Sequence, residues 1–212
     1  MARSKSRRRV VAAQAATQRR RRNYMLYAGL GGAGLVVVAI IFATLISSNG
    51  SAGNAVAEDD GLAKDFSFTL YQGEQELGGE KLNLAELRGK PVVLNFWAGL
   101  CPPCRAEMPD LQRFYEESQD EVVMLGIDVG RFNNLGGQRD AQNLLRELQI
   151  TYPAGFTRDG SVMRGYEVIS MPTTVFINSK GEVFQSWSGI ITRDILVSLT
   201  ESMANAEARS AS

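Results

Sequence analysis

The 212-residue sequence contains no histidine and only two cysteines, Cys101 and Cys104. Structural zinc sites are built from about four cysteine or histidine ligands, so a zinc site of that kind within one chain is excluded. A disulfide across a C-x-x-C spacing closes a very short loop and restricts the unfolded chain only slightly, so it would stabilise the fold little. The two thiols therefore require a chemical explanation rather than a structural one.

Acidic residues are absent from the first 57 positions, although the whole chain carries 23 acidic and 23 basic residues. That N-terminal part holds nine Lys or Arg residues, which leaves the remainder with a net charge of −9. The two parts are therefore expected to face different environments. Basic arms often bind nucleic acid, but a basic cluster beside an apolar run is explained more simply by membrane topology and anionic headgroups. We expect no nucleic-acid partner.

A long uncharged run extends from Met25 to Ser47, and its 23 residues match the about 20 that a helix needs to cross a bilayer. Because Arg19 to Arg22 precede it, the positive-inside rule makes residues 1–24 a basic cytoplasmic segment and places the following chain outside. A cleaved signal peptide is the alternative, since Ala55-Val56-Ala57 resembles a processing site, but the run exceeds the ~7–15 residues of a signal core. We predict a signal anchor at 25–47 that contacts the lipid bilayer, followed by a flexible linker at 48–63.

The two cysteines lie where a strand pattern ends and a helix pattern begins. Val92 to Trp97 reads as a buried strand, and an amphipathic helix follows with Met108, Leu111, Phe114 and Tyr115 on one face. A thiol at a helix N-terminus faces free N–H groups and the positive end of the helix dipole, which lower its pKa. The chemistry predicts that Cys101, the more N-terminal thiol, attacks a substrate disulfide and that Cys104 resolves the mixed disulfide.

Strand and helix patterns alternate through the rest of the domain. Strands are predicted at 66–70, 122–128, 173–177 and 183–187, and helices around the apolar positions of 141–148 and 195–203. Gly73 and Gly78-Gly79 indicate a hairpin near the start, and residues 152–166 are expected to be irregular. This order predicts an α/β fold with a mixed sheet flanked by helices.

The chain resembles the thioredoxin superfamily, and within it the membrane-anchored TlpA/ResA-like thiol-disulfide oxidoreductases. Leu94-Asn95-Phe96-Trp97, Cys101-Pro102-Pro103-Cys104 and the later Met171-Pro172-Thr173-Thr174 carry the resemblance. It covers residues 64–203, implies a thioredoxin-like fold with an N-terminal β extension and a central helical insert, and leaves 204–212 as a frayed tail. The absence of histidine separates the chain from copper-delivery relatives of this fold.

The resemblance also assigns roles to residues around the cysteines. It implies a cis bond between Met171 and Pro172, which would leave the Met171 backbone free to pair with substrate. Together with Trp97, Pro102 and Pro103, these residues make up the predicted substrate-binding set. Plain thioredoxins have a buried Asp where this chain has Asn95, which cannot ionise. In the ResA-like group a Glu three residues after the second cysteine assists the resolving thiol, and Glu107 holds that position; a solvated helix glutamate is the simpler alternative.

The resulting prediction is an extracytoplasmic, membrane-tethered protein-disulfide oxidoreductase without a metal or cofactor, whose redox centre is the Cys101–Cys104 disulfide. The resemblance favours a reductant that acts on protein disulfides, with apocytochrome c as a candidate substrate, as in cytochrome c biogenesis. A membrane thiol-electron donor of the DsbD/CcdA kind would supply electrons. A disulfide-forming oxidase and a non-catalytic binding or chaperone module remain as alternatives. A peroxidase is less favoured, because no Thr-x-x-Cys peroxide motif is present.

Overall fold

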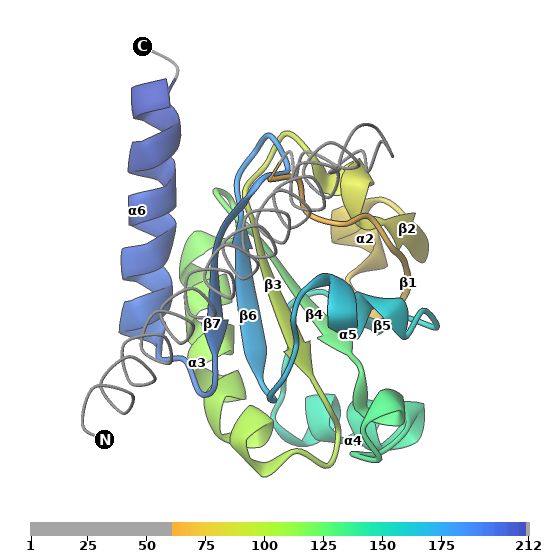
Figure 1. Cartoon of the computed structure of the whole chain (residues 1–212). Coiled ribbons are helices and arrows are strands. Elements are labelled where there is room, and N and C mark those ends of the chain that lie inside the picture. The colour runs from red at the N-terminus through yellow and green to blue at the C-terminus, as the bar shows by residue number, and fades with distance from the viewer. Residues whose placement is uncertain (1–60, 211–212) are drawn as a thin grey trace, which may run out of the picture. The chain divides into compact units, whose positions relative to one another are not determined.

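The computed structural model describes residues 61–210, which form one domain (Figure 1). The strands are β1 Ser67–Gln72, β2 Lys81–Asn83, β3 Val92–Trp97, β4 Val123–Asp128, β5 Ala154–Phe156, β6 Thr173–Ile177 and β7 Val183–Ser188. The α-helices are α2 Glu74–Leu77, α3 Pro102–Ser118, α4 Gln138–Glu147, α5 Ser161–Gly165 and α6 Arg193–Ser210, and the 3-10 turns are η1 Leu84–Leu87 and η2 Gly130–Phe132.

The strands form one mixed sheet in the order β2-β1-β5-β4-β3-β6-β7. The central strands β3, β4 and β5 are parallel, whereas the β1–β2 and β6–β7 pairs are antiparallel. Parallel neighbours need a crossover, and α3 and α4 provide the two crossovers on the same side of the sheet. The carboxyl end of β3 therefore leads directly into the turn that carries both cysteines.

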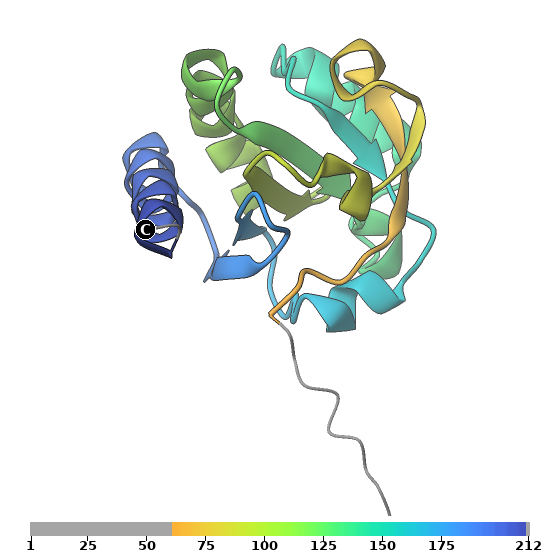
Figure 2. The same cartoon turned by 90° about the horizontal axis from the view of Figure 1, so that it is seen from above.

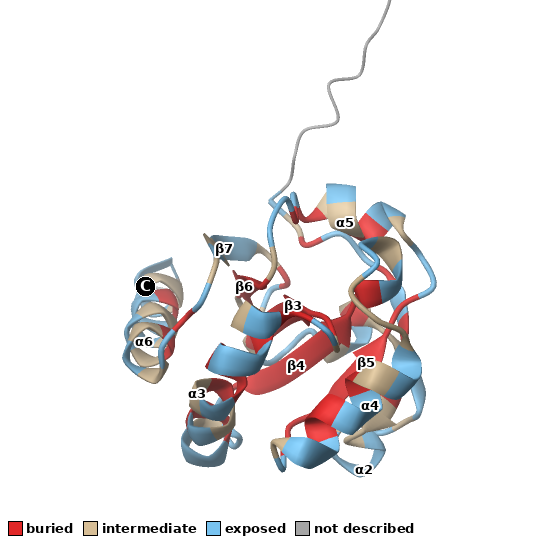
Figure 3. Cartoon of the chain, turned by 90° about the horizontal axis from the view of Figure 1, so that it is seen from below, coloured by how far each residue is buried: buried red, intermediate tan, exposed pale blue. Residues whose placement is uncertain are grey.

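Each face of the sheet has its own apolar core. On one face, the buried side chains of α3, α4 and α6 pack on alternate residues of the strands, among them Val93, Trp97 and Met124. On the other face, α5, η1 and the segment before β1 cover Leu94, Phe96 and their neighbours. Figures 2 and 3 show α3 and α4 on one side of the sheet and α5 on the other. The continuous apolar runs of β3 and β4 reflect this two-sided burial.

Most of the predicted elements are confirmed, including the β6–β7 hairpin and the inserted helix α4. The irregular structure predicted for residues 152–166 is wrong in part, because β5 and α5 lie within it. β5 has only three residues, and a side chain at Gly155 would lie 2.3 Å from the Thr69 carbonyl oxygen. Such a strand owes its existence to its neighbours β1 and β4 rather than to its own pattern.

Two predicted boundaries also need correction. The frayed tail from Ala204 is wrong up to Ser210, because α6 continues that far and Glu207 accepts hydrogen bonds from the Ser179 N–H and hydroxyl. The last residues of the predicted linker belong to the domain, since Ala63 N–H donates to the Gly181 carbonyl at 2.8 Å and Val183 N–H donates to the Gly61 carbonyl at 2.8 Å. Both ends of the domain are therefore fastened to the β6–β7 turn and β7.

The structure does not test the predicted membrane anchor. No helix within residues 61–210 has the length and apolar character needed to cross a bilayer. The predicted span 25–47, the basic segment 1–24 and most of the predicted linker lie outside the described residues.

Candidate redox site

Cys101 and Cys104 form a disulfide at the start of α3, with their Cα atoms 5.3 Å apart. Cys101 is the N-cap residue of the helix, so its sulfur lies at the positive end of the helix dipole. The Cys104 backbone N–H donates to Cys101 Sγ at 3.3 Å. Cys101 is 3% exposed and Cys104 is completely buried. When the disulfide opens, this position favours a thiolate on Cys101.

The two prolines occupy the first two positions of α3, where a missing N–H costs little. Neither can donate to the sulfur of Cys101, so the N–H of Cys104 is the backbone donor that remains in this part of the turn. Pro102 is exposed and Pro103 is half-buried, so both lie where a docked substrate could contact them. The two prolines therefore leave the Cys101 sulfur with few backbone donors at this turn.

The turn before the cysteines is held by α4 and the segment leading to it. Leu100 N–H donates to the Leu135 carbonyl at 2.8 Å, while the Leu100 side chain is 58% exposed beside Cys101. A Cβ at Gly99 would lie 2.4 Å from the backbone nitrogen of Ala141, so a side chain at this position would displace α4. The inserted helix therefore fixes the approach of the chain to Cys101.

The Met171–Pro172 bond is cis, as predicted. Pro172 is buried, and its carbonyl accepts a hydrogen bond from Gly189 N–H at 2.9 Å. Met171 is half-buried and packs against the apolar cluster that contains both cysteines and Trp97. Within residues 61–210, no hydrogen bond engages the backbone of Met171. Its N–H and carbonyl are thus available to an extended substrate segment.

Glu107 lies one turn after Cys104 on the buried face of α3, with 1% of its surface exposed. The alternative of a solvated helix glutamate is therefore wrong. Its Oε1 accepts from Asn95 Nδ2 at 2.8 Å, and its Oε2 accepts from the Ile191 backbone N–H at 3.0 Å. Burial raises the pKa of Glu107 to about 7, although both hydrogen bonds act in the opposite direction. A carboxyl group with that pKa exchanges a proton readily near neutral pH.

Sequence reasoning missed the partners of this carboxyl group. Asn95 was noted only as a departure from a buried Asp, but it also donates to Thr174 Oγ1 at 3.0 Å. Thr174 appears in the sequence analysis only as part of the Met171-Pro172-Thr173-Thr174 motif, with no role assigned, and Ile191 does not appear there. Thr174 follows the Met171-Pro172-Thr173 stretch directly, and this adjacency was the available signal. Ile191 acts through its backbone, for which the sequence carries no signal.

Trp97 is completely buried and forms part of the core behind the turn, so the structure supports a packing role rather than direct contact with a substrate. Tyr152 is completely buried in the same cluster, and its ring meets that of Tyr115 edge-on with centroids 6.2 Å apart. Burial raises the pKa of Tyr152, and the nearby Glu107 carboxylate raises it further, so the phenol stays neutral. Both side chains belong to the buried apolar cluster that also contains the two cysteines.

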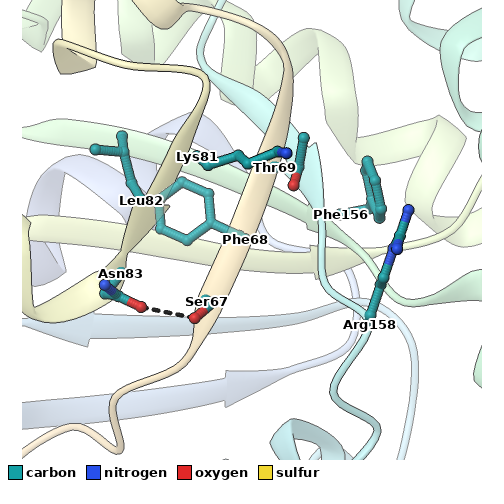
Figure 4. Close-up of a pocket in the computed structure, with 8 residues that line it drawn as sticks. All are labelled: Ser67, Phe68, Thr69, Lys81, Leu82, Asn83, Phe156 and Arg158. Atoms are coloured by element: carbon teal, nitrogen blue, oxygen red, sulfur yellow. Dashed lines mark hydrogen bonds between the residues drawn. The ribbon is translucent and has the colours of Figure 1, made fainter.

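A separate hollow of about 310 Å³ lies between β1, β2 and β5 (Figure 4). Lys81 and Arg158 flank it, and Ser67 donates to Asn83 at its edge. It contains none of the predicted site residues. Within residues 61–210, no group of three or more Asp, Glu or Cys side chains could hold a metal ion.

Comparisons with known proteins give the family and the fold of the chain. Residues 61–186 match the model of the AhpC/TSA family. The chain is 34% identical to the thiol-disulfide oxidoreductase ResA of Oceanobacillus iheyensis over 165 residues, which cover 76% of this chain and 80% of that protein. It is 30% identical over 149 residues to sporulation thiol-disulfide oxidoreductase A of Bacillus subtilis, covering 70% and 87%. The crystal structure of StoA from Bacillus subtilis superposes with a TM-score of 0.55 at 26% identity, covering 66% of this chain and 98% of that one. The superposition confirms the predicted thioredoxin-like fold.

Proposed function

Since this chain belongs to the AhpC/TSA family and is a thiol-disulfide oxidoreductase of the ResA and StoA type, we propose that the Cys101–Cys104 pair is its redox centre. The pair exchanges its disulfide with thiols and disulfides of protein substrates. The observation that carries this proposal is the Cys101–Cys104 disulfide at the N-terminus of α3, with the buried Glu107 one turn further along.

In the reducing direction, the Cys101 thiolate attacks one sulfur of a substrate disulfide. The substrate S–S bond breaks, a mixed disulfide with Cys101 forms, and the departing substrate thiolate takes up a proton. Leu100, which is exposed and precedes Cys101, provides a contact for the substrate segment, and so does the unengaged backbone of Met171, whose side chain packs against the cluster that contains both cysteines. Cys101 attacks because it is the N-cap residue and Cys104 is completely buried.

The Cys104 thiol then closes the cycle. It loses its proton, attacks Cys101 Sγ and releases the second substrate thiol, so two electrons pass from the enzyme dithiol to the substrate disulfide. Glu107 receives the Cys104 proton, because residues three apart on a helix are neighbours and the Glu107 pKa is about 7. When a donor reduces the enzyme again, Glu107 returns the proton to Cys104.

The favoured physiological direction is reduction, with apocytochrome c as the candidate substrate and a membrane thiol-electron donor of the DsbD/CcdA kind as the source of electrons. The likeness to ResA supports this choice. The rival is an oxidase that installs disulfides through the same two cysteines. A binding or chaperone module that uses only the Met171 groove would not need the thiols.

The reduction potential of the Cys101–Cys104 couple separates these functions. The full chain, kept in detergent, is equilibrated with glutathione or dithiothreitol buffers, and the fraction of disulfide is measured. We expect a potential near or below the ~−270 mV of thioredoxin, as suits a reductant. A potential near ~−120 mV would assign the chain to disulfide formation, and the absence of a two-electron couple would leave only the binding module.

We further propose that residues 25–47 anchor the chain in the cell membrane with the N-terminus in the cytoplasm and the domain outside. The support is the uncharged run of 23 residues directly after four arginines. An anchor of this kind would hold the thiols beside a membrane-bound electron donor.

Protease treatment of intact spheroplasts tests this topology. We expect added protease to degrade the domain while an epitope tag at the N-terminus stays protected, and we expect carbonate washing to leave the chain in the membrane fraction. A variant that lacks residues 25–47 serves as the control and should leave that fraction. Protection of the domain in intact spheroplasts, or its release in a form cleaved near Ala57, would overturn the anchored topology.

A further inference from the structure

We propose that Asn95 is a positioning residue whose side-chain amide turns with the protonation state of Glu107. Its Nδ2 donates to the Glu107 carboxylate, and its Oδ1 accepts from the Glu107 carboxylic acid. The inference rests on the proposed role of Glu107 as the proton acceptor for Cys104. It adds a residue that keeps this buried carboxyl group hydrogen-bonded in both of its states.

The observed contacts fit the ionised state. Both carboxylate oxygens accept an N–H group, from Asn95 Nδ2 at 2.8 Å and from Ile191 N–H at 3.0 Å. A carboxylate has only acceptors, so two donors satisfy it. The second proton of Asn95 Nδ2 goes to Thr174 Oγ1 at 3.0 Å. Asn95 Oδ1 is buried and has no hydrogen-bond partner among residues 61–210.

Protonation of Glu107 changes what the carboxyl group needs. The new O–H must find an acceptor, but both groups that hydrogen-bond to the carboxyl in the observed arrangement are donors. A half-turn of the Asn95 amide places Oδ1 where Nδ2 now lies. Oδ1 can then accept from the Glu107 O–H, and the Thr174 hydroxyl can reverse from acceptor to donor. The same three side chains therefore form a connected network in either state, and the unpaired Oδ1 is the acceptor that the protonated state uses.

The register of the sheet places Asn95 beside Thr174 and within hydrogen-bonding distance of Glu107. Asn95 pairs with Thr174 of β6 in the antiparallel register and with Gly126 of β4 in the parallel register. Both Asn95 and Thr174 are completely buried. Glu107 approaches them from α3, twelve residues further along the chain. An Asp at position 95 would instead bring two carboxylates within hydrogen-bonding distance, where like charges prevent both from ionising.

Among the groups around this network, Glu107 is the one that exchanges a proton near neutral pH. From α3, the neighbouring titratable groups are the two cysteines, which form the disulfide. Ahead of β5, Tyr152 faces the site, and the Glu107 charge raises its pKa, so it stays neutral. β3 and β6 contribute the uncharged Asn95 and Thr174, and the segment before α6 contributes the Ile191 N–H. Within residues 61–210, no Lys or Arg charge shifts the pKa of Glu107.

The test follows the carboxyl carbon of Glu107 by ¹³C NMR in the oxidised full chain, which needs no enzymatic turnover. The wild type is expected to titrate with a midpoint of about 7. Asn95→Leu removes a hydrogen-bond partner from both states of Glu107. The charge-assisted bond to the carboxylate is worth more than the neutral bond to the acid, so the midpoint should still rise by about one pH unit or more, a tenfold or larger change in the proton equilibrium. Asn95→Asp should replace the single step by two coupled steps, one below and one above the wild-type midpoint.

Matched variants separate this effect from altered stability. Asn205→Asp makes the same chemical change on an exposed part of α6 and should leave the Glu107 midpoint unchanged. Thr200→Val removes a buried hydroxyl that has no hydrogen-bond partner within residues 61–210. It is the control for Thr174→Val, which removes a hydroxyl that hydrogen-bonds to Asn95 in both proposed states. Thr174→Val should lower stability more than Thr200→Val. It should move the midpoint little, because Asn95 loses its hydrogen bond to Thr174 in both states of Glu107 while its contact with Glu107 remains.

Nuclear Overhauser contacts report the turn of the amide itself. Contacts from the Asn95 Nδ2 protons to the Thr174 methyl group should weaken as the pH falls through the Glu107 midpoint. Contacts that stay constant across the titration, or a Glu107 midpoint unmoved in Asn95→Leu, would overturn the proposal for Asn95. The proposed role of Glu107 has its own test. It is overturned if Glu107→Gln leaves unchanged the pH dependence of the step in which Cys104 resolves the mixed disulfide.

Discussion

Replacement of Cys101 by serine is expected to abolish disulfide reduction, by a factor on the order of 10³ or more. A serine hydroxyl at the N-cap still accepts the Cys104 N–H, so the helix start is preserved while the nucleophile is lost. The measurement is the rate at which the reduced chain reduces a protein disulfide such as insulin. A Cys101→Ser chain that keeps its full biological function would favour the binding or chaperone module.

Cys104→Ser provides the matched variant for the second thiol. It keeps the attacking Cys101 but cannot resolve the mixed disulfide, so a covalent complex with the substrate should accumulate. Mass spectrometry of the complex would locate the link at Cys101. A complex that instead formed with Cys101→Ser, through Cys104, would reverse the assignment of the two roles.

Glu107→Gln is expected to slow resolution of the mixed disulfide at neutral pH by about 10²-fold, the lower range for a lost general base. Glu107 accepts a proton only when ionised. With its pKa raised by burial to about 7, the wild-type rate should increase as the pH rises through that value. The variant should lose this inflection. The pH dependence of the rate is measured by stopped flow, in single turnovers against oxidised glutathione, over a range of about pH 5 to 9.

The stability of the fold provides an independent measurement of the same group. The folded pKa of Glu107 lies above the ordinary value of 4.5, so between 4.5 and about 7 the folded chain binds more protons than the unfolded chain. Its stability should therefore decrease as the pH rises through that window, by about 3 kcal/mol as an order of magnitude. Glu107→Gln should lack this component in urea unfolding.

The exposed Glu201→Gln on α6 is the control for both measurements, and it should change neither the pH profile nor the stability. Gln at position 107 also places an amide N–H group against one of two N–H donors, so its overall stability must be determined before rates are compared. A variant that folds well and keeps the wild-type inflection near pH 7 would exclude Glu107 as the proton acceptor.

The strand-turn-helix unit around Cys101 could be predicted from the sequence because its causes are local. The apolar run of β3, the prolines at the first two positions of α3 and the apolar face of that helix lie within a continuous stretch. Each follows from backbone geometry and solvent exclusion, which act over a few residues. The Cys101–Cys104 disulfide follows from the same stretch.

Short elements and boundaries could not be predicted in this way. β5 depends on strands on both sides of it, and the last turns of α6 are held by a side chain from the β6–β7 turn. The composition of a three-residue strand, or of an alanine-rich helix end, carries too little signal to reveal such contacts. The predicted anchor at 25–47 rests on the sequence alone, since it lies outside the described residues.

The sequence by itself determined the fold class and the positions of the two thiols. The apolar patterns of the strands and helices, and the prolines at the start of α3, depend on residues that are close together in the chain. Only the tertiary structure decided that Glu107 is a buried acid rather than a surface residue. Its partners come from residues 12 and 84 positions away, and Asn95 meets Thr174 across 79 positions. Strand register and helix packing bring these groups together, and burial in the resulting apolar core is what raises the Glu107 pKa toward neutrality.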